Sequence, residues 1–242
     1  MTTGTTWYSW EGSRWAELWT IFHPPYTGMV VCYVLLGGLL APTIHLDRLL
    51  WMVVAYILGL GLGAHALDQL SGRPYGRSFS KAELWLMAIT SLAAACAIGG
   101  YYAITVSPWL WVFIALETFF AVTYNLDRLF RGRFHTDGYF VLSWGVLPFL
   151  VSYFIQTLSL SASAFLMALA LGGTAAMEIT LSRWVRALRR NPARLIMLQA
   201  DGKQEEWDVR RLIGRPERAL KLLVLTVYLL TVGLAARRWW GP

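Results

Sequence analysis

Long apolar runs are the feature that most limits what this chain can fold into. A helix needs about 20 apolar residues to cross the roughly 30 Å of hydrocarbon in a bilayer, whereas membrane strands alternate over shorter segments. Only 14% of the 242 residues are charged and 57% are hydrophobic, which disfavours a soluble domain. We therefore expect an all-α, polytopic membrane helical bundle of about seven transmembrane helices. The runs are 26–44, 49–67, 84–106, 108–125, 139–157, 162–182 and 219–236.

The segments outside these runs suggest a division of the chain into four parts. The first 25 residues are rich in tryptophan and lack the compact apolar run and the cleavage site of a signal peptide, so we expect an interfacial amphipathic segment there. In the last loop, Asp201-Gly202 stands between two short runs, which is typical of a hairpin turn. The predicted parts are the interfacial segment 1–25, a six-helix membrane bundle 26–182, a basic cytoplasmic loop 183–218, and a final membrane helix with its tail 219–242.

Basic residues are distributed unevenly between the two sides of the predicted bundle. With seven spans, Arg48, Arg237 and Arg238 fall on one side, and the remaining 18 of the 21 Lys and Arg residues fall on the side of the N-terminal tail. Segments rich in Lys and Arg are retained in the cytoplasm. We therefore expect an integral, multi-pass membrane protein whose N-terminus and large basic loop are cytoplasmic.

The basic loop also bears on possible partners. Between residues 183 and 221 the chain has eleven basic and five acidic residues. Such a surface can meet anionic lipid headgroups, a diphosphate or nucleic acid, and membrane lipid is the commonest partner of a basic cluster beside a membrane. No nucleic-acid-binding motif accompanies the charge, so we expect no nucleic acid partner.

Ionisable residues at the ends of two predicted helices form a candidate site. His65 and Asp68 share a helical face at the end of the second run, and Glu178 lies near the end of the sixth. Carboxylates that hold Mg²⁺ beside guanidinium groups suit a diphosphate leaving group. Alternatively, these acids only pair with nearby arginines at an interface. The arginines that follow the two acids are Arg73, Arg77, Arg183 and Arg186.

Four stretches resemble the UbiA-type superfamily of intramembrane prenyltransferases. They are "FHPPYTGMVVCYVLLGGLLAP", "LGLGAHALDQLSGRP", "YNLDRLFRGRFHTDGYF" and "LSWGVLPFLVSYF". The resemblance covers roughly residues 20 to 190. It implies a helical bundle around a central cavity, and transfer of a prenyl group from a polyprenyl diphosphate to an acceptor, or cyclisation of a terpene, with Mg²⁺ as cofactor.

The same resemblance assigns roles to individual residues. Asp68 and Glu178 would be catalytic and would orient the metal ion, with His65 as a further candidate ligand. Arginines would bind the diphosphate, and aromatic residues would stabilise developing allylic cation character. The implied substrate-binding residues are Arg73, Arg77, Tyr124, Asn125, Trp144, Tyr153, Arg183 and Arg186.

The chain also departs from the family's metal-binding motifs. The first motif reads N-x-x-x-D-x-x-x-D, and with Asp68 as its middle residue, Ala64 and Gly72 replace the other two ligands. The second motif, D-x-x-x-D, is represented by Glu178 and Ser182. A second interpretation is therefore a non-catalytic protein with a decayed site, which binds a lipid or pigment or serves as a subunit beside another membrane protein.

Overall fold

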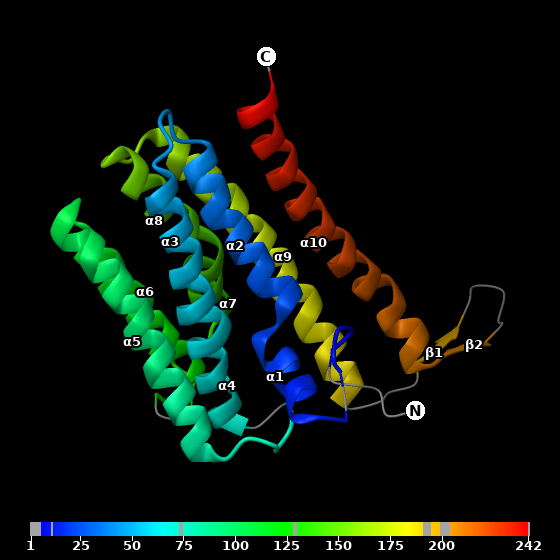
Figure 1. Ribbon diagram of the computed structural model, residues 1–242. Helices are drawn as coiled ribbons and strands as arrows, with labels where there is room; N and C mark the ends of the chain where they lie inside the picture. The colour runs from blue at the N-terminus through cyan, green and yellow to red at the C-terminus, as the bar shows by residue number, and fades with distance from the viewer. Residues whose placement is uncertain are drawn as a thin grey trace.

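The computed structural model describes residues 6–10, 12–72, 75–127, 130–190, 195–198 and 204–241, and these are mainly helical (Figure 1). Two segments, η1 and η2, have the wider π-helical winding. In chain order the elements are α1 (Arg14–Phe22), α2 (Pro24–Leu39), α3 (Leu46–Tyr56), η1 (Ile57–Ala64), α4 (His65–Gly72), α5 (Lys81–Thr105), α6 (Leu110–Asn125), α7 (Asp137–Phe140), η2 (Val141–Val146), α8 (Leu147–Thr157), α9 (Ala162–Arg190), β1 (Leu195–Leu198), β2 (Gln204–Trp207) and α10 (Val209–Trp240).

Each predicted apolar run overlaps a helix, but the helices differ in length. Within the described ranges, five are long and apolar enough to cross a membrane, consistent with an integral multi-pass protein. The apolar helices α2 and α6 have 16 residues each. At 1.5 Å per residue they rise about 24 Å, which is less than the roughly 30 Å of hydrocarbon. The expected count of seven spans is therefore not confirmed. The five longer helices are Leu46–Gly72, Lys81–Thr105, Asp137–Thr157, Ala162–Arg190 and Val209–Trp240.

Helix α2 occupies the middle of the bundle. It packs against α8, α3 and α10, while α9 packs against α10 and η2, and α5 packs against η1 and α6. Tyr33 and Leu36 of α2 and Phe149 of α8 are almost fully buried in the largest apolar cluster. This packing places the ends of α4, α6 and α9 around one end of the bundle. We call it the basic end; it also carries α1 and the β1–β2 hairpin, and the C-terminus lies at the opposite end (Figure 1).

Helices occupy both ends of the expected basic loop 183–218. Its first residues extend α9 to Arg190, and its last residues begin α10 at Val209. The physical reason is an apolar cluster in which Val185 packs with Ile213 and Leu220, so both helices continue beyond the hydrophobic runs. Charged residues occupy the other faces of these extensions.

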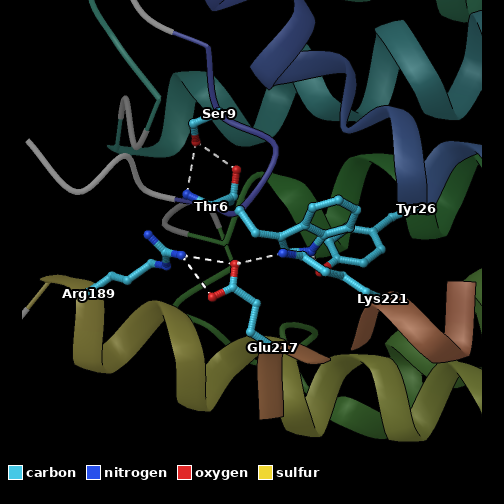
Figure 2. Close-up of polar contacts among 7 residues, drawn as sticks. Thr6, Ser9, Tyr26, Arg189, Glu217 and Lys221 are labelled. Atoms are coloured by element: carbon cyan, nitrogen blue, oxygen red, sulfur yellow. Dashed lines mark hydrogen bonds and ion pairs between the residues drawn. The ribbon is translucent and has the colours of Figure 1, made fainter. Parts of the chain in front are cut away.

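A polar contact joins the same two helices (Figure 2). The guanidinium of Arg189 donates hydrogen bonds of 3.0 Å to both carboxylate oxygens of Glu217. Lys221 lies 3.8 Å from the same carboxylate, and its ammonium sits 5.2 Å from the ring centroid of Trp7. The Trp7 indole in turn donates to the Tyr26 hydroxyl. The N-terminal segment is therefore attached to α2 and α10.

Strands β1 and β2 pair in antiparallel fashion, with Leu195 opposite Trp207 and Leu198 opposite Gln204. This pairing agrees with the expected hairpin. The Asp201-Gly202 turn itself lies outside the described residues.

Helix α1 lies within the segment expected to be interfacial. Trp15 and Trp19 are exposed, whereas Ile21 is fully buried. The chain then turns at His23, whose φ of 50° is left-handed and ends α1, and Pro24 begins α2. The turn directs the ring of His23 toward the basic end of the bundle, where it lines a polar cavity.

Candidate functional site

A polar cavity of about 710 Å³ lies at the basic end. Its walls come from the α1–α2 corner, from α4 and the loop after it, from the end of α6, from the η2 region and from the last turns of α9. These elements are far apart in sequence. The apolar packing of the bundle brings their polar ends together.

Asp68 and Glu178 both line this cavity. Glu178 is 5% exposed, while Asp68 is half-buried. The two acids expected at the ends of the second and sixth runs therefore share one pocket. A third carboxylate, Asp127, also lines it, and its Oδ1 is buried without a hydrogen-bond partner among the described residues.

Three arginines of α9 line the same cavity. Arg183, Arg186 and Arg190 are three and four positions apart, so they lie on one helical face. Arg183 forms an ion pair of 2.5 Å with Asp137 of α7, and its Nη2 is buried with no hydrogen-bond partner within the described part of the chain. Arg186 donates to the Ser182 hydroxyl over 3.4 Å. The cavity is thus lined by both guanidinium groups and carboxylates.

Tyr75, which sequence reasoning missed, lies within reach of both kinds of charge. Burial raises the pKa of its hydroxyl above the ordinary value, and the negative charge of Asp68 raises the pKa further. Arg186 opposes this shift through its charge and a hydrogen bond to the phenol oxygen. The charges of Asp68 and Arg186 therefore both reach the hydroxyl group of Tyr75. No motif in the sequence marks this tyrosine, because it lies in a loop.

His23 and His65 form an edge-to-face pair on another wall. Their ring centroids are 4.5 Å apart, and the His23 ring is 4.6 Å from that of Tyr75. Burial lowers the pKa of His23 well below its usual value, and His65 and Arg186 lower it further. His23 is therefore neutral at pH 7 and pairs through Nδ1 with the hydroxyl of Tyr8.

His65 is held by its neighbours. Its Nδ1 lies 3.1 Å from the Gly61 carbonyl oxygen of η1, and its ring is 5.4 Å from that of Trp144. Aromatic packing and a backbone hydrogen bond account for this buried side chain. Its proposed role as a metal ligand gains no support from these contacts.

Aromatic residues complete the wall. Trp144 stacks on Phe140 at 4.8 Å, and Tyr124 stacks on His135 at 4.3 Å. Next to Tyr124, the Asn125 backbone carbonyl accepts a 2.6 Å hydrogen bond from Ser71 of α4. Tyr124, Asn125 and Trp144, all expected at the site, do line the cavity.

Two expected substrate-binding residues do not line the polar cavity. Arg77 is exposed and does not line the cavity. Tyr153 stacks on Phe149 in the bundle interior and lies nine residues beyond Trp144, or about 13 Å along the helix axis. Both expectations are therefore not met, because the loop turns Arg77 outward and the helix rise carries Tyr153 away from the basic end. Arg73 lies outside the described residues.

The donor set can be compared with the needs of Mg²⁺, the cofactor that the resemblance implies. Among the described residues no group of three His, Cys, Asp or Glu side chains could hold a metal ion. Mg²⁺ is commonly bound through one or two carboxylates together with substrate phosphates. Asp68 and Glu178, which line the same cavity, are the two carboxylates that the resemblance assigns to this mode, in which the metal arrives with a phosphate-bearing ligand.

Comparison with known proteins does not identify a related protein. No protein-family model, curated protein or solved structure matches this chain. The chemistry of the polar cavity therefore has to be inferred from its own residues.

Proposed function

We propose that this protein is a UbiA-like intramembrane prenyltransferase. In this proposal the polar cavity binds the diphosphate group of a polyprenyl diphosphate, and the prenyl chain is transferred to an acceptor. The observation that carries it is that Asp68, Glu178 and the arginine face of α9 line one cavity at the basic end of the bundle. The resemblance in sequence supports the same activity.

Arg183, Arg186 and Arg190 are the residues proposed to hold the diphosphate. Guanidinium groups bind phosphate oxygens through paired, charge-assisted hydrogen bonds. The buried Nη2 of Arg183, which has no partner among the described residues, is a donor that such an oxygen would satisfy. Because the cations are placed before the reaction begins, they favour the state in which negative charge has moved to the leaving group.

Asp68 and Glu178 are the proposed ligands of Mg²⁺. When bound with substrate, the metal would supply further neutralisation of diphosphate charge. In the reaction the C1–O bond breaks and its electron pair leaves with pyrophosphate. The acceptor's nucleophilic atom then bonds to C1 and loses a proton.

Trp144, Phe140 and Tyr124 form the wall that would face the reacting carbon. Aromatic faces attract cationic character, and an apolar wall limits attack by water on an allylic cation. The stacking of Trp144 on Phe140 holds the indole in place.

One observation favours the alternative, a non-catalytic lipid- or pigment-binding protein or complex subunit. The residues that the structure describes include no three-ligand metal group, and Arg183 is already paired with Asp137. Such a protein would hold the phosphate of a membrane lipid in the same cavity without breaking a bond.

Thermal unfolding with added pyrophosphate tests binding at this cavity. A ligand that binds only the folded state stabilises it, by about 2.7 kcal/mol at a concentration 100 times its Kd. We expect pyrophosphate with Mg²⁺ to raise the unfolding temperature of the purified protein. Asp68→Asn and Arg186→Gln should each abolish the rise. Arg77→Gln, outside the cavity, is the matched control and should retain it.

Release of pyrophosphate separates the two functions. We expect the wild-type protein to release it from prenyl diphosphates in the presence of Mg²⁺ and a lipid extract as acceptor source. A thermal shift without release at any chain length would instead support the non-catalytic binder. If no phosphate ligand shifts the unfolding temperature, both proposals fail.

A further inference from the structure

A second cavity, of about 110 Å³, lies deeper in the bundle among η1, α5, α6 and α8. Its lining is almost entirely apolar. Small residues of η1 and α5 pack closely at its edge: a Cβ added to Gly59 of η1 would lie 3.2 Å from the Ala95 Cβ of α5. An apolar cavity of similar size, about 150 Å³, is known to stay dry and to bind small apolar molecules.

Glu117 interrupts this apolar lining. It lies near the midpoint of α6, seven residues after Leu110 and eight before Asn125, so about 10 Å or more of helix separates it from either end. A carboxyl group at membrane depth is costly, and when present it usually serves a ligand or transport path. Sequence reasoning did not single out this residue.

Tyr56 is the partner of Glu117. The tyrosine hydroxyl donates a 2.7 Å hydrogen bond to Oε1, and within the described residues no hydrogen bond reaches Oε2. Both residues line the cavity. One tyrosine leaves most of the hydrogen-bonding capacity of a carboxyl group unused, and Glu117 lines a cavity whose surface is mostly apolar.

We propose that the apolar cavity, with its Glu117–Tyr56 pair, binds the head of a neutral lipophilic molecule that carries a hydroxyl group. The carboxyl of Glu117 both donates to and accepts from the hydroxyl, and the apolar walls hold the first few carbons of the attached chain. A neutral head is favoured over an ammonium because two opposite charges would have to be desolvated at membrane depth. This proposal does not depend on the proposed prenyl transfer.

The two cavities are neighbours. Tyr124, Asn125 and Trp144 line both of them. A molecule in the apolar cavity therefore lies behind the wall of the polar cavity, on its membrane side.

Photolabelling in lipid nanodiscs tests the proposal. The probes are a long-chain primary alcohol, the matching hydrocarbon and the matching primary amine, each with a photoreactive diazirine near the head. We expect the alcohol to label α5 and α6 about fivefold more than the hydrocarbon, the ratio given by roughly one net hydrogen bond. Labelled peptides are identified by mass spectrometry.

Variants make the test specific. Glu117→Leu removes the polar group, and Ala95→Phe fills the cavity; each should reduce alcohol labelling to the hydrocarbon level. Glu117→Gln keeps a neutral donor and acceptor and should retain the labelling. Ala93→Phe, on the exposed side of α5, is the matched control for the added ring and should also retain it. Circular dichroism establishes that each variant remains helical.

Three outcomes would overturn the proposal. Equal labelling by the alcohol and the hydrocarbon would show that the site does not recognise the hydroxyl group. Stronger labelling by the amine, lost in Glu117→Gln, would show recognition of charge instead. Alcohol labelling that survives in both Glu117→Leu and Ala95→Phe would place the bound molecule elsewhere. None of these outcomes bears on pyrophosphate binding in the polar cavity.

Discussion

Buried polar side chains at the basic end are held by short-range partners. Gln69 is 1% exposed; its amide nitrogen donates to the Gly76 carbonyl over 2.9 Å, and its side-chain oxygen accepts from the backbone N–H of Tyr75 over 3.2 Å. Glu17 of α1 accepts from the Ser78 N–H over 2.7 Å. Gln69, the neighbour of Asp68, and Glu17 of α1 thus order the loop that carries Tyr75, which places this phenol beside the acid.

Protonation of His23 should make stability depend on pH. Its pKa is lowered in the folded state, so the unfolded chain binds more protons below the unfolded value of about 6.5. This contribution to stability is fully present above about pH 6.5 and is lost as pH falls, with a slope of up to about 1.4 kcal/mol per pH unit. Thermal unfolding between about pH 8 and pH 5 measures it.

The matched variant for this prediction is His23→Asn. Asparagine tolerates the left-handed backbone found at this position, so the substitution adds little strain. We expect the variant to lose stability less steeply than the wild type as pH falls. An unchanged slope would mean that other groups cause the acid sensitivity.

At the scale of elements, small residues set how closely the helices approach. Gly37 of α2 faces α8, and a Cβ added there would lie 2.5 Å from the Phe149 carbonyl oxygen and 2.9 Å from the Ser152 Cβ. Ser152 also donates a 2.6 Å hydrogen bond to the Val34 carbonyl of α2. Close backbone approach and an interhelical hydrogen bond are typical of helix packing in membranes.

Gly37→Ala should therefore destabilise the bundle. The new methyl group meets backbone atoms that cannot rotate away, and overpacking of this kind costs about 1–3 kcal/mol. The measurement is the unfolding temperature in detergent. Gly173→Ala on α9 is the control, because its Cβ would have no neighbour within 4 Å, and it should be neutral or stabilising by up to about 1 kcal/mol. Equal effects of the two substitutions would contradict the close contact.

At the scale of the whole molecule, the two cavities differ in their distance from the basic end of the bundle. The polar cavity lies at the basic end, and the apolar cavity lies deeper, near the middle of α6. Arg48 and Arg238 are at the other end, where they donate to the backbone carbonyls of Ile155 and Pro42. Because basic segments stay in the cytoplasm, we expect the polar cavity to face that side.

Cysteine labelling tests this orientation. With Cys32 and Cys96 replaced by alanine, Ser78→Cys places an exposed thiol at the basic end, and Ser159→Cys places one at the opposite end. In intact cells a membrane-impermeant maleimide should label Ser159→Cys and leave Ser78→Cys unlabelled until the membrane is permeabilised. The reverse pattern would show that the orientation inferred from charge is wrong.

Local features of the chain were predictable, and some positions were not. Each apolar run overlaps a helix, and the paired strands agree with the expected hairpin. Both features were predictable because they depend on residues close together in the sequence. Arg77 and Tyr153 were misplaced, since spacing along a helix does not reveal which way a loop turns or how deep a residue lies. Tyr75 and Glu117 were missed, because neither stands in a recognisable motif.

Apolar length and the placement of charge are properties of the linear chain, so a reader of the residues alone can infer a helical membrane protein with one basic side. The cavities, in contrast, are formed only by the tertiary structure. Asp68 of α4 and Glu178 of α9 line one cavity because the packing of the bundle fixes the positions and rotations of their helices. Glu117 contacts Tyr56, the last residue of α3, because α6 packs beside η1, which continues directly from α3. Those rotations are set by side-chain packing between helices distant in sequence, which no local pattern encodes.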